Sequence, residues 1–454
     1  PLGQFYEVSY DMAVPYNICS GAQDNGAWCG PSKRRNTPIN NNQWFTISGG
    51  DGFYTAQDPT DPNIVWGESQ EGGVVRRNLK TGETGRMNKP TWQASYRVYA
   101  DSILTIRGDT TQPETSAQTR ELAALRAAQK TDSIALDMRF NWETPFLVSH
   151  FNPQIFYMAG NRVLKSVKRG DDLYPISPDL STADNAKIQV SLVTTGGITN
   201  DATCAENYCT IVSLAESYLR PGWLYAGTDD GNVWMTHDDG ANWEKLNGRF
   251  PGVPAGTYVS RIEPSHFDTN TFFVAFDNHR TNDFGVYLYE TNDGGRTFHS
   301  IASDLPTGGP DYVHVIREDP YNKILLFVGT SRAAYASIDG GAHWSRFMAD
   351  LPTVPVYDLQ IQPRDHDLIA ATFGRGIWIA NIAPIEQLDS KVLASNVHLF
   401  QPVTAYQYGQ GPEVGASANG AGQQVFEAPS PTYGANVSYR LANSVRGGVH
   451  VIVS

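Results

Sequence analysis

One eight-residue pattern recurs three times in the second half of the sequence, and it constrains the fold more than any other feature. Each copy has Ser or Thr, then Asp two residues later, Gly two residues after that, and Trp or Phe at its end. An Asp side chain can accept hydrogen bonds from the N–H groups of a turn, Gly permits a positive φ, and the aromatic ring can pack between neighbouring sheets. The pattern predicts three structural hairpin turns, at Asp238, Gly240 and Trp243, at Asp293, Gly295 and Phe298, and at Asp339, Gly341 and Trp344.

The spacing of these turns predicts a β-propeller. Asp238 and Asp293 are 55 residues apart, and Asp293 and Asp339 are 46 apart, which is near the length of one four-stranded blade. Each interval also repeats an alternating strand, a turn, an apolar strand and the hairpin. A weaker fourth copy, with Lys168 in place of Asp, stands at 166–173. Tracing this order predicts an all-β propeller of seven blades, opening near Phe5, Phe53, Phe140, Thr210, Val259, Val313 and Val356, with residues 44–47 as the outer strand of the first blade.

Two regions depart from this order. Helix-forming residues in the stretch 111–137 predict an inserted helix on the propeller surface. After Ile382 the pattern ends, the glycine-rich stretch 415–422 is typical of a flexible linker, and alternating stretches at 435–441 and 448–453 predict two strands of a β-sandwich. We therefore expect a propeller over 1–386, a linker over 387–426 and the first strands of a truncated β-sandwich domain over 427–454.

Charge, hydropathy and cysteines restrict the partners and the compartment. The 47 acidic and 34 basic residues give a net charge of −13, which disfavours nucleic acids and anionic membrane surfaces. No segment approaches 18 consecutive apolar residues, so no membrane insertion is expected. Two local pairs, Cys19 with Cys29 and Cys204 with Cys209, indicate disulfides in a secreted, periplasmic or cell-surface protein. Metal binding and buried free thiols are the alternatives.

Short motifs along the chain resemble those of a known family. They stand at 3–11 (GQFYEVSYD), 21–26 (GAQDNG), 49–53 (GGDGF), 139–142 (RFNW), 227–231 (GTDDG) and 374–378 (GRGIW). Together with the repeated turns, which resemble the Asp box, they are similar to large secreted bacterial proteins with BNR/Asp-box repeats, classed as sortilin-type or glycosyl-hydrolase-like. The resemblance implies the C-terminal half of two tandem propellers, followed by a small β-sandwich. A preceding propeller of the same precursor is then an expected partner.

A more distant resemblance is to the family 74 xyloglucanases, which also have two tandem seven-bladed propellers. In that family the second propeller carries a Gly-Asp-x-x-Gly-like catalytic stretch early in its first blade, and residues 21–26 stand in a similar place. Here Gln23 stands where Gly precedes the Asp, and the partner acid would belong to the other propeller. The resemblance therefore carries over Asp24 alone.

Asp24 and Asp51 are the candidate catalytic residues. We expect them on adjacent blades, where their carboxyls could face one cleft, and glycoside hydrolysis needs such a pair, one protonated and one ionised. A disulfide between Cys19 and Cys29 would hold the loop that carries Asp24 and Asn25 in place. The alternative is that both aspartates only stabilise tight turns.

Charged and polar residues on or beside the predicted inner strands are the candidate ligand-binding residues. Besides Asn25, they are Arg139 with Asn141, Arg261 with Glu263, Arg317 with Glu318, and Arg375. One interpretation is a channel for an anionic ligand. The other, which we favour, is a ring of buried ion pairs, because charges in such a lining must be paired.

Two further clusters of polar residues stand in predicted loops. Asp277, His279, Arg280 and Asp283 could bind a ligand, and Asp229 with Asp230 could hold a structural Ca²⁺ through oxygen ligands. In both cases the alternative is a set of solvated loop residues. No other cofactor is expected.

Motifs of several enzyme classes are absent from the sequence. It has no Gly-x-Ser-x-Gly, His-Glu-x-x-His, P-loop or Rossmann pattern, which argues against serine hydrolases, zinc proteases and nucleotide-binding enzymes. The arginine triad and tyrosine nucleophile of sialidases cannot be assigned either. We expect an extracellular ligand-recognition module for a polysaccharide, protein or peptide. The alternative is a glycoside hydrolase-like enzyme that cleaves a polysaccharide between two propellers.

Overall fold

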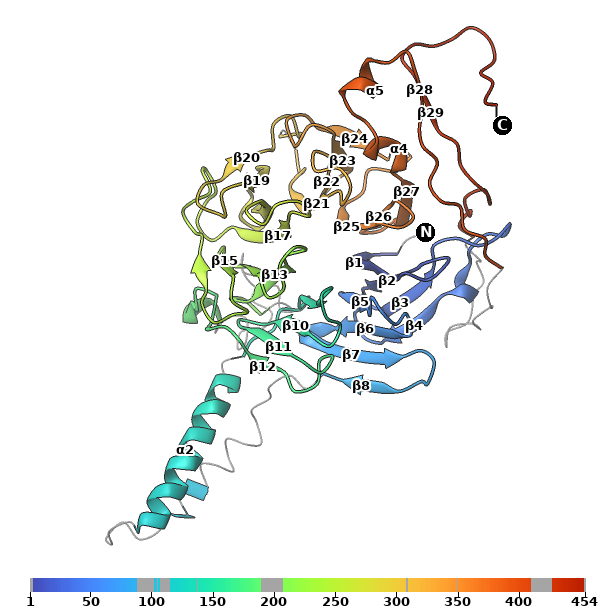
Figure 1. The fold of residues 1–454 in the computed structure, drawn as a ribbon. Coiled ribbons are helices and arrows are strands. Elements are labelled where there is room, and N and C mark those ends of the chain that lie inside the picture. Colours follow the sequence, from blue (N-terminus) through green and yellow to red (C-terminus); the bar gives the residue numbers. More distant parts are fainter. Residues whose placement is uncertain are drawn as a thin grey trace.

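The computed structural model describes residues 3–87, 102–103, 105–106, 115–136, 138–188, 207–307, 309–348, 350–409 and 427–452. Within these residues, seven antiparallel sheets stand around a central axis as the blades of a β-propeller (Figure 1). The predicted fold class and number of blades are confirmed. Six blades have four strands, and the seventh has three in the described part of the chain.

Each blade is a meander whose strands follow one another from the axis outward. Blade 1 comprises β1 (Phe5–Tyr10), β2 (Asn17–Ala22), β3 (Gly26–Pro31) and β4 (Phe45–Ser48), and blade 2 comprises β5 (Thr55–Gln57), β6 (Ile64–Ser69), β7 (Gly73–Asn78) and β8 (Thr84–Arg86). Blade 3 comprises β9 (Phe146–Val148), β10 (Phe156–Ala159), β11 (Val163–Ser166) and β12 (Tyr174–Pro175), and blade 4 comprises β13 (Ile211–Glu216), β14 (Leu224–Thr228), β15 (Val233–Thr236) and β16 (Glu244–Lys245).

The last three blades follow the same order. Blade 5 comprises β17 (Tyr258–Pro264), β18 (Phe272–Asp277), β19 (Tyr287–Thr291) and β20 (His299–Ser300), and blade 6 comprises β21 (Val313–Glu318), β22 (Leu326–Thr330), β23 (Ala334–Ser337) and β24 (Ser345–Phe347). Blade 7 comprises β25 (Val356–Gln362), β26 (Asp367–Thr372) and β27 (Gly376–Asn381).

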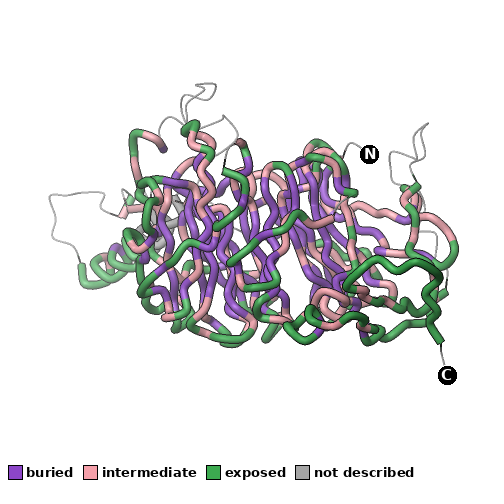
Figure 2. Tube along the Cα trace, turned by 90° about the horizontal axis from the view of Figure 1, so that it is seen from above, coloured by how far each residue is buried: buried purple, intermediate pink, exposed green. Residues whose placement is uncertain are grey.

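Apolar side chains between neighbouring blades hold the ring together. The second strands, such as β18 and β26, are buried along their whole length because each has a neighbouring blade on both faces. Buried apolar clusters occupy every junction between neighbouring blades. The cluster of Val8, Tyr16, Ile18, Ile369 and Ala371 joins the last blade to the first and closes the ring. Figure 2 shows the buried strands inside the disc and the exposed loops at its two faces.

The three repeated turns have the structure that the sequence predicts. Each lies between the third and fourth strands of its blade, and its carboxylate accepts a backbone N–H four residues later, at 2.8 Å for Asp238, 3.0 Å for Asp293 and 2.9 Å for Asp339. The weaker copy occupies the same place in blade 3, where the Gly170 N–H donates to the Ser166 hydroxyl at 3.1 Å. The hydrogen bond from the Gly N–H to the Ser hydroxyl is thus present although Lys168 stands in place of the Asp.

The insertion and the C-terminal segment differ in part from expectation. Helix α2 (Ser116–Leu136) confirms the predicted helix, and Figure 1 shows it extending away from the disc. Beyond blade 7, α4 (Ala383–Glu386) and α5 (Ser390–Ala394) precede β28 (Val397–Leu399), which pairs with β29 (Tyr439–Leu441). The expected linker 387–426 therefore contains regular structure before residue 410, and its glycine-rich stretch lies outside the described residues.

One of the two C-terminal strands was predicted wrongly. The stretch 435–441 contains β29, but residues 448–452 contain no strand. Their alternating apolar side chains are exposed, and no strand among the described residues pairs with their backbone. Within the described part of the chain, no helix is long and apolar enough to cross a membrane.

Candidate ligand site at the mouth of the channel

The first strands of the blades surround the channel and all start at the same face of the disc. The start of each first strand pairs with the end of the second strand, as Phe5 pairs with Ala22 and Tyr258 with Asp277. The turns between second and third strands therefore lie at this face too. We call it the mouth face, and it carries the turn with Asp24, the loop with Asp51, the 3₁₀ helix η3 (His279–Thr281) and the turn with Arg375.

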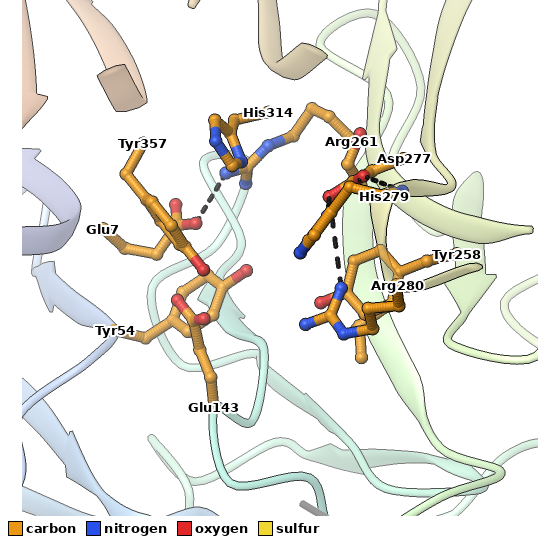
Figure 3. Close-up of a pocket in the computed structure, with 12 residues that line it drawn as sticks. Glu7, Tyr54, Glu143, Tyr258, Arg261, Asp277, His279, Arg280, His314 and Tyr357 are labelled. Atoms are coloured by element: carbon orange, nitrogen blue, oxygen red, sulfur yellow. Dashed lines mark hydrogen bonds and ion pairs between the residues drawn. The ribbon is translucent and has the colours of Figure 1, made fainter. Parts of the chain in front are cut away.

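A small pocket opens in the channel at the mouth face, and every blade contributes to it. Its volume is about 40 Å³. The space for one water is roughly 10–15 Å³ on such a measure, so about three water-sized atoms fit. The lining residues are Glu7, Tyr54, Glu143, Val212, Tyr258, Ser260, Arg261, Asp277, His279, Arg280, His314 and Tyr357 (Figure 3).

A network of ion pairs extends from the pocket lining, at Glu7 and Arg261, into the channel behind it. Arg261 contacts Glu7 at 2.6 Å and Asp358 at 3.4 Å. Arg317 contacts Asp358 at 2.8 Å and Glu263 at 2.8 Å. We call these five residues, which come from blades 1, 5, 6 and 7, the deep network. All are buried, so the ring of buried ion pairs is the interpretation that the structure favours over an open anion channel.

The deep network has three carboxylates for two guanidinium groups, and its pKa values reflect this excess. Burial raises the pKa of Glu7 to about 7, although Arg261 lowers it. Burial also opposes ionisation of Asp358, but Arg317 and Arg261 outweigh it and lower the pKa of that carboxyl. Near neutral pH, a proton on Glu7 therefore balances part of the excess negative charge.

Aromatic rings form a continuous series beside the pocket. Tyr357 stacks with His314 at a centroid distance of 4.7 Å and with Phe373 at 5.6 Å, and Tyr6 meets Tyr357 edge-on at 5.2 Å. Tyr312 continues the series from His314. Burial lowers the pKa of His314 to about 4, so its ring is neutral at physiological pH. The mouth thus combines aromatic side chains with polar atoms.

The polar loop after β18 lies at the pocket, as the ligand-binding hypothesis requires. The carboxylate of Asp277 contacts His279 Nδ1 at 2.7 Å. Burial opposes ionisation of Asp277, but its contacts with His279 outweigh this effect and lower the pKa. The guanidinium of Arg280 lies 4.6 Å from the centre of the Tyr258 ring. Asp283 is not in the lining, and its carboxylate accepts from Asn278 and Tyr287 instead.

Five of the predicted ligand-binding residues lie away from the pocket: Asn25, Glu318, which accepts from the Ser265 hydroxyl, and three others. Arg139 is buried in blade 3, where it pairs with Asp179 at 2.7 Å. Asn141 donates to the Thr210 hydroxyl at 2.9 Å. Arg375 is exposed on a turn and donates to the adjacent carbonyl of Gly374. Of the predicted set, Arg261 lines the pocket itself, while Glu263 and Arg317 lie in the network behind it.

Asp24 and Asp51 lie together, but one carboxylate holds the other residue's backbone. Asp51 accepts the Asp24 N–H at 2.6 Å and the Gln70 side-chain N–H at 2.7 Å, and it is buried. Asp24 has a φ of 60° and is exposed, like Asn25, whose side chain donates to the Gln23 carbonyl. Asp51 therefore stabilises the turn that carries Asp24, and the Asp24 carboxyl lies at the surface of the mouth face.

The cysteines differ between the two pairs. Cys19 and Cys29 form a disulfide between β2 and β3, next to the Asp24 turn. Cys209 is a buried free thiol that faces the hydroxyl of Thr182, which departs from the expected second disulfide. Its expected partner, Cys204, lies outside the described residues. The disulfide supports an oxidising compartment.

The candidate calcium residues are engaged in hydrogen bonds. Asp229 accepts from the N–H and hydroxyl of Thr210, and Asp230 accepts from Thr182 and Thr228. Across the described ranges, no group of three or more His, Cys, Asp or Glu side chains could hold a metal ion.

Sequence reasoning missed several residues of the site. They are Glu7, Tyr54, Glu143, Tyr258, His314, Tyr357 and Asp358. A shared signal exists in hindsight, because each lies within or just before the first strand of its blade. Superposing the seven predicted first strands would have found polar and aromatic residues at these positions.

Comparison with known proteins supports the fold. No model of a known protein family matches the sequence, and no curated protein sequence matches it either. Among solved structures, the GH74 xyloglucanase from Xanthomonas campestris aligns with a TM-score of 0.53 at 14% identity, over 84% of this chain and 52% of that one. The Niastella koreensis GH74 enzyme aligns with a TM-score of 0.51 at 13% identity, over 84% and 53%. The chain thus spans about half the length of these structures, and at such identities the likeness shows a shared propeller fold.

Proposed function

We propose that this propeller is an extracellular ligand-recognition module that binds a polysaccharide or a protein at its mouth face, within a larger protein that has a second propeller. The observation that carries the proposal is the pocket, because all seven blades contribute to it. A site built from every blade is rigid, and a rigid site loses little conformational entropy on binding. The disulfide beside the Asp24 turn fits an extracellular module.

The character of the mouth suits recognition better than hydrolysis. The partly exposed aromatic side chains of the mouth, such as Tyr357 and Phe373, can pack against a sugar or an apolar side chain. The carboxylates of the deep network are held by guanidinium groups, and Asp51 is held by backbone and amide N–H groups. None of these carboxylates is placed as a free acid and base pair.

A glycoside hydrolase-like function is the second candidate, and the exposed Asp24 favours it. Its carboxyl has no hydrogen-bond partner among the described residues, its backbone is fixed by Asp51, and a disulfide joins the two strands of its hairpin. An acid placed in this way could act if a second carboxylate came from another propeller. The half-length match to GH74 enzymes is compatible with such a two-propeller arrangement.

The test is a binding screen on glycan and peptide arrays, with digestion of soluble polysaccharides alongside. Tyr357→Ala should weaken binding at the mouth face. Tyr321→Ala should not, because Tyr321 is 54% exposed beyond the opposite end of β21. Binding that is insensitive to Tyr357→Ala would overturn the proposed site.

The same screen separates recognition from hydrolysis. Asp24→Asn should leave binding intact if the module only recognises its ligand. Loss of polysaccharide cleavage in Asp24→Asn, measured in this chain and in any longer form with a preceding propeller, would establish the hydrolase instead.

A further inference from the structure

The pocket contains hydrogen-bonding groups that the protein itself does not use. In the described part of the chain, the hydroxyls of Tyr54 and Tyr357 have no hydrogen-bond partner, and both residues line the pocket. Figure 3 shows these hydroxyls and the carboxyl of Glu143 turned toward one another. Burial raises the pKa of both tyrosines well above the usual value, so each hydroxyl stays protonated and can donate or accept.

The charges of the lining are mixed, which selects for a neutral ligand group. Three lining residues are carboxylates, Glu7, Glu143 and Asp277, and two are guanidinium groups, Arg261 and Arg280. An anion would meet the carboxylates in this small space, and a cation would meet the guanidinium groups. A hydroxyl can donate to a carboxylate and accept from a cation or a tyrosine at the same time.

Two buried nitrogens beside the pocket strengthen the case for a polar ligand. Arg261 Nε and His314 Nε2 are buried without a hydrogen-bond partner, and both residues belong to the lining. An unsatisfied buried polar atom is costly. Small adjustments on binding would bring such atoms to a ligand oxygen or to a water that bridges to it.

The size and depth of the pocket limit what can enter. Its volume of about 40 Å³ admits a group of a few atoms but no complete sugar ring. The buried charges of the deep network lie behind it. A pocket of this size has no room for a chain that passes through it, so an end or a branch is the part that can insert, while the next part of the ligand stays outside beside the aromatic series at Tyr357 and Phe373.

We propose that the pocket receives the hydroxymethyl group of a neutral hexose at the end or on a branch of a glycan, with the sugar ring packed against the partly exposed aromatic side chains of the mouth. This inference rests on the proposed function and narrows its ligand to a neutral glycan bound end-on. Binding of a peptide in place of a glycan would contradict this inference.

The direct experiment compares sugars that differ in one hydroxyl. Methyl glycosides of glucose, galactose and mannose are titrated against the full chain by ligand-observed NMR, each beside its 6-deoxy counterpart. We expect at least one hexoside to bind and its 6-deoxy form to bind about tenfold more weakly, because a hydrogen bond to a charged group is lost. Equal affinity of both forms, or no binding by any hexoside, would overturn the inference.

A matched pair of variants tests the position of the group. Tyr357→Phe removes one hydroxyl and keeps the ring. It should weaken binding of the hexoside about fivefold and reduce the difference in affinity between the hexoside and its 6-deoxy form. Tyr335→Phe, on β23 and outside the pocket, should change neither value. If Tyr357→Phe leaves the difference in affinity between the two forms unchanged, the inference is wrong.

The two proposals fail in different ways. If array glycans bind and Tyr357→Ala abolishes the binding, but 6-deoxy sugars bind as well as hexoses, only the hydroxymethyl assignment is wrong. If only peptides bind, and they need Tyr357, recognition at the mouth face stands and the glycan assignment falls. If no ligand of either class depends on Tyr357, the proposed function fails.

Discussion

The deep network and the pocket above it share one channel but have opposite hydrogen-bonding states. In the deep network each guanidinium contacts two carboxylates, and these contacts link four of the seven blades. In the pocket, the hydroxyls of Tyr54 and Tyr357 have no partner within the described chain. The same first strands carry both regions, only a few residues apart, as Tyr357 and Asp358 on β25 show.

This difference suggests that the deep network serves stability and the pocket hydroxyls serve ligand binding. Buried charges must be paired, so the deep network has little freedom to meet a ligand, and its removal should affect folding. Unpaired neutral hydroxyls cost less free energy of folding than unpaired charges, and a ligand can form hydrogen bonds with them. We therefore expect substitutions of the paired charges of the deep network to change stability, and substitutions of the pocket tyrosines Tyr54 and Tyr357 to change affinity.

The largest effect should come from Asp358→Asn. Asp358 is fully buried and contacts both Arg261 and Arg317. Asp358→Asn breaks one ion pair of each guanidinium group and leaves Arg261 with Glu7 and Arg317 with Glu263. Because these broken pairs are buried, the substitution should lower the free energy of unfolding by about 3–5 kcal/mol. Urea denaturation measures this loss.

A surface pair provides the control for that substitution. Asp171 contacts Arg76 at 3.2 Å and is half exposed, so Asp171→Asn should cost less than about 1 kcal/mol. If Asp358→Asn costs no more than this control, the deep network does not stabilise the propeller and the comparison between the two regions breaks down.

The next effect concerns pH and Glu7. Its pKa is raised from the usual 4.5 to about 7 in the folded protein, so the folded state binds a proton that the unfolded state has released. This contribution to stability is fully present below pH 4.5 and is lost as the pH rises through 7, by about 3 kcal/mol in total.

Glu7→Gln should remove that pH dependence. The variant cannot ionise, so between pH 5 and pH 8 its unfolding free energy should fall less than that of the wild type, as denaturation at both pH values would show. Parallel profiles for the two proteins would mean that Glu7 does not carry the proton.

The fold could be predicted because its signals are local. The aspartate, glycine and aromatic of each repeated turn stand within eight residues, and the strands before each turn alternate at short range. The failed prediction of a strand at 448–453 has the same basis, because alternation within a segment does not show whether a partner strand exists. Helix α2 was predictable for its composition, and composition does not determine the direction in which it leaves the disc.

The site could be predicted only in part, because its contacts are distant in sequence. Arg261 and Glu7 are 254 residues apart and meet across the channel. The sequence indicated that Arg261 and Arg317 need buried partners, and this is confirmed, but it suggested neighbours on the same strand. The partners come from other blades, and a single strand's pattern carries no information on what faces it across the axis.

The smallest effect is expected at Asp51 and Asp24, where a hydrogen-bonded carboxylate again lies near one without a hydrogen-bond partner. Asp51 accepts two hydrogen bonds, so Asp51→Ala leaves the Asp24 N–H and the Gln70 amide unpaired and should lower the unfolding free energy by about 1–2 kcal/mol. Asp24→Asn should change it by less than about 0.5 kcal/mol, because the side chain is exposed and Asn tolerates a positive φ. Thermal and urea unfolding of both variants measure the contrast. Equal losses would show that Asp24 is also a structural residue, and this would remove the strongest support for Asp24 as a catalytic acid.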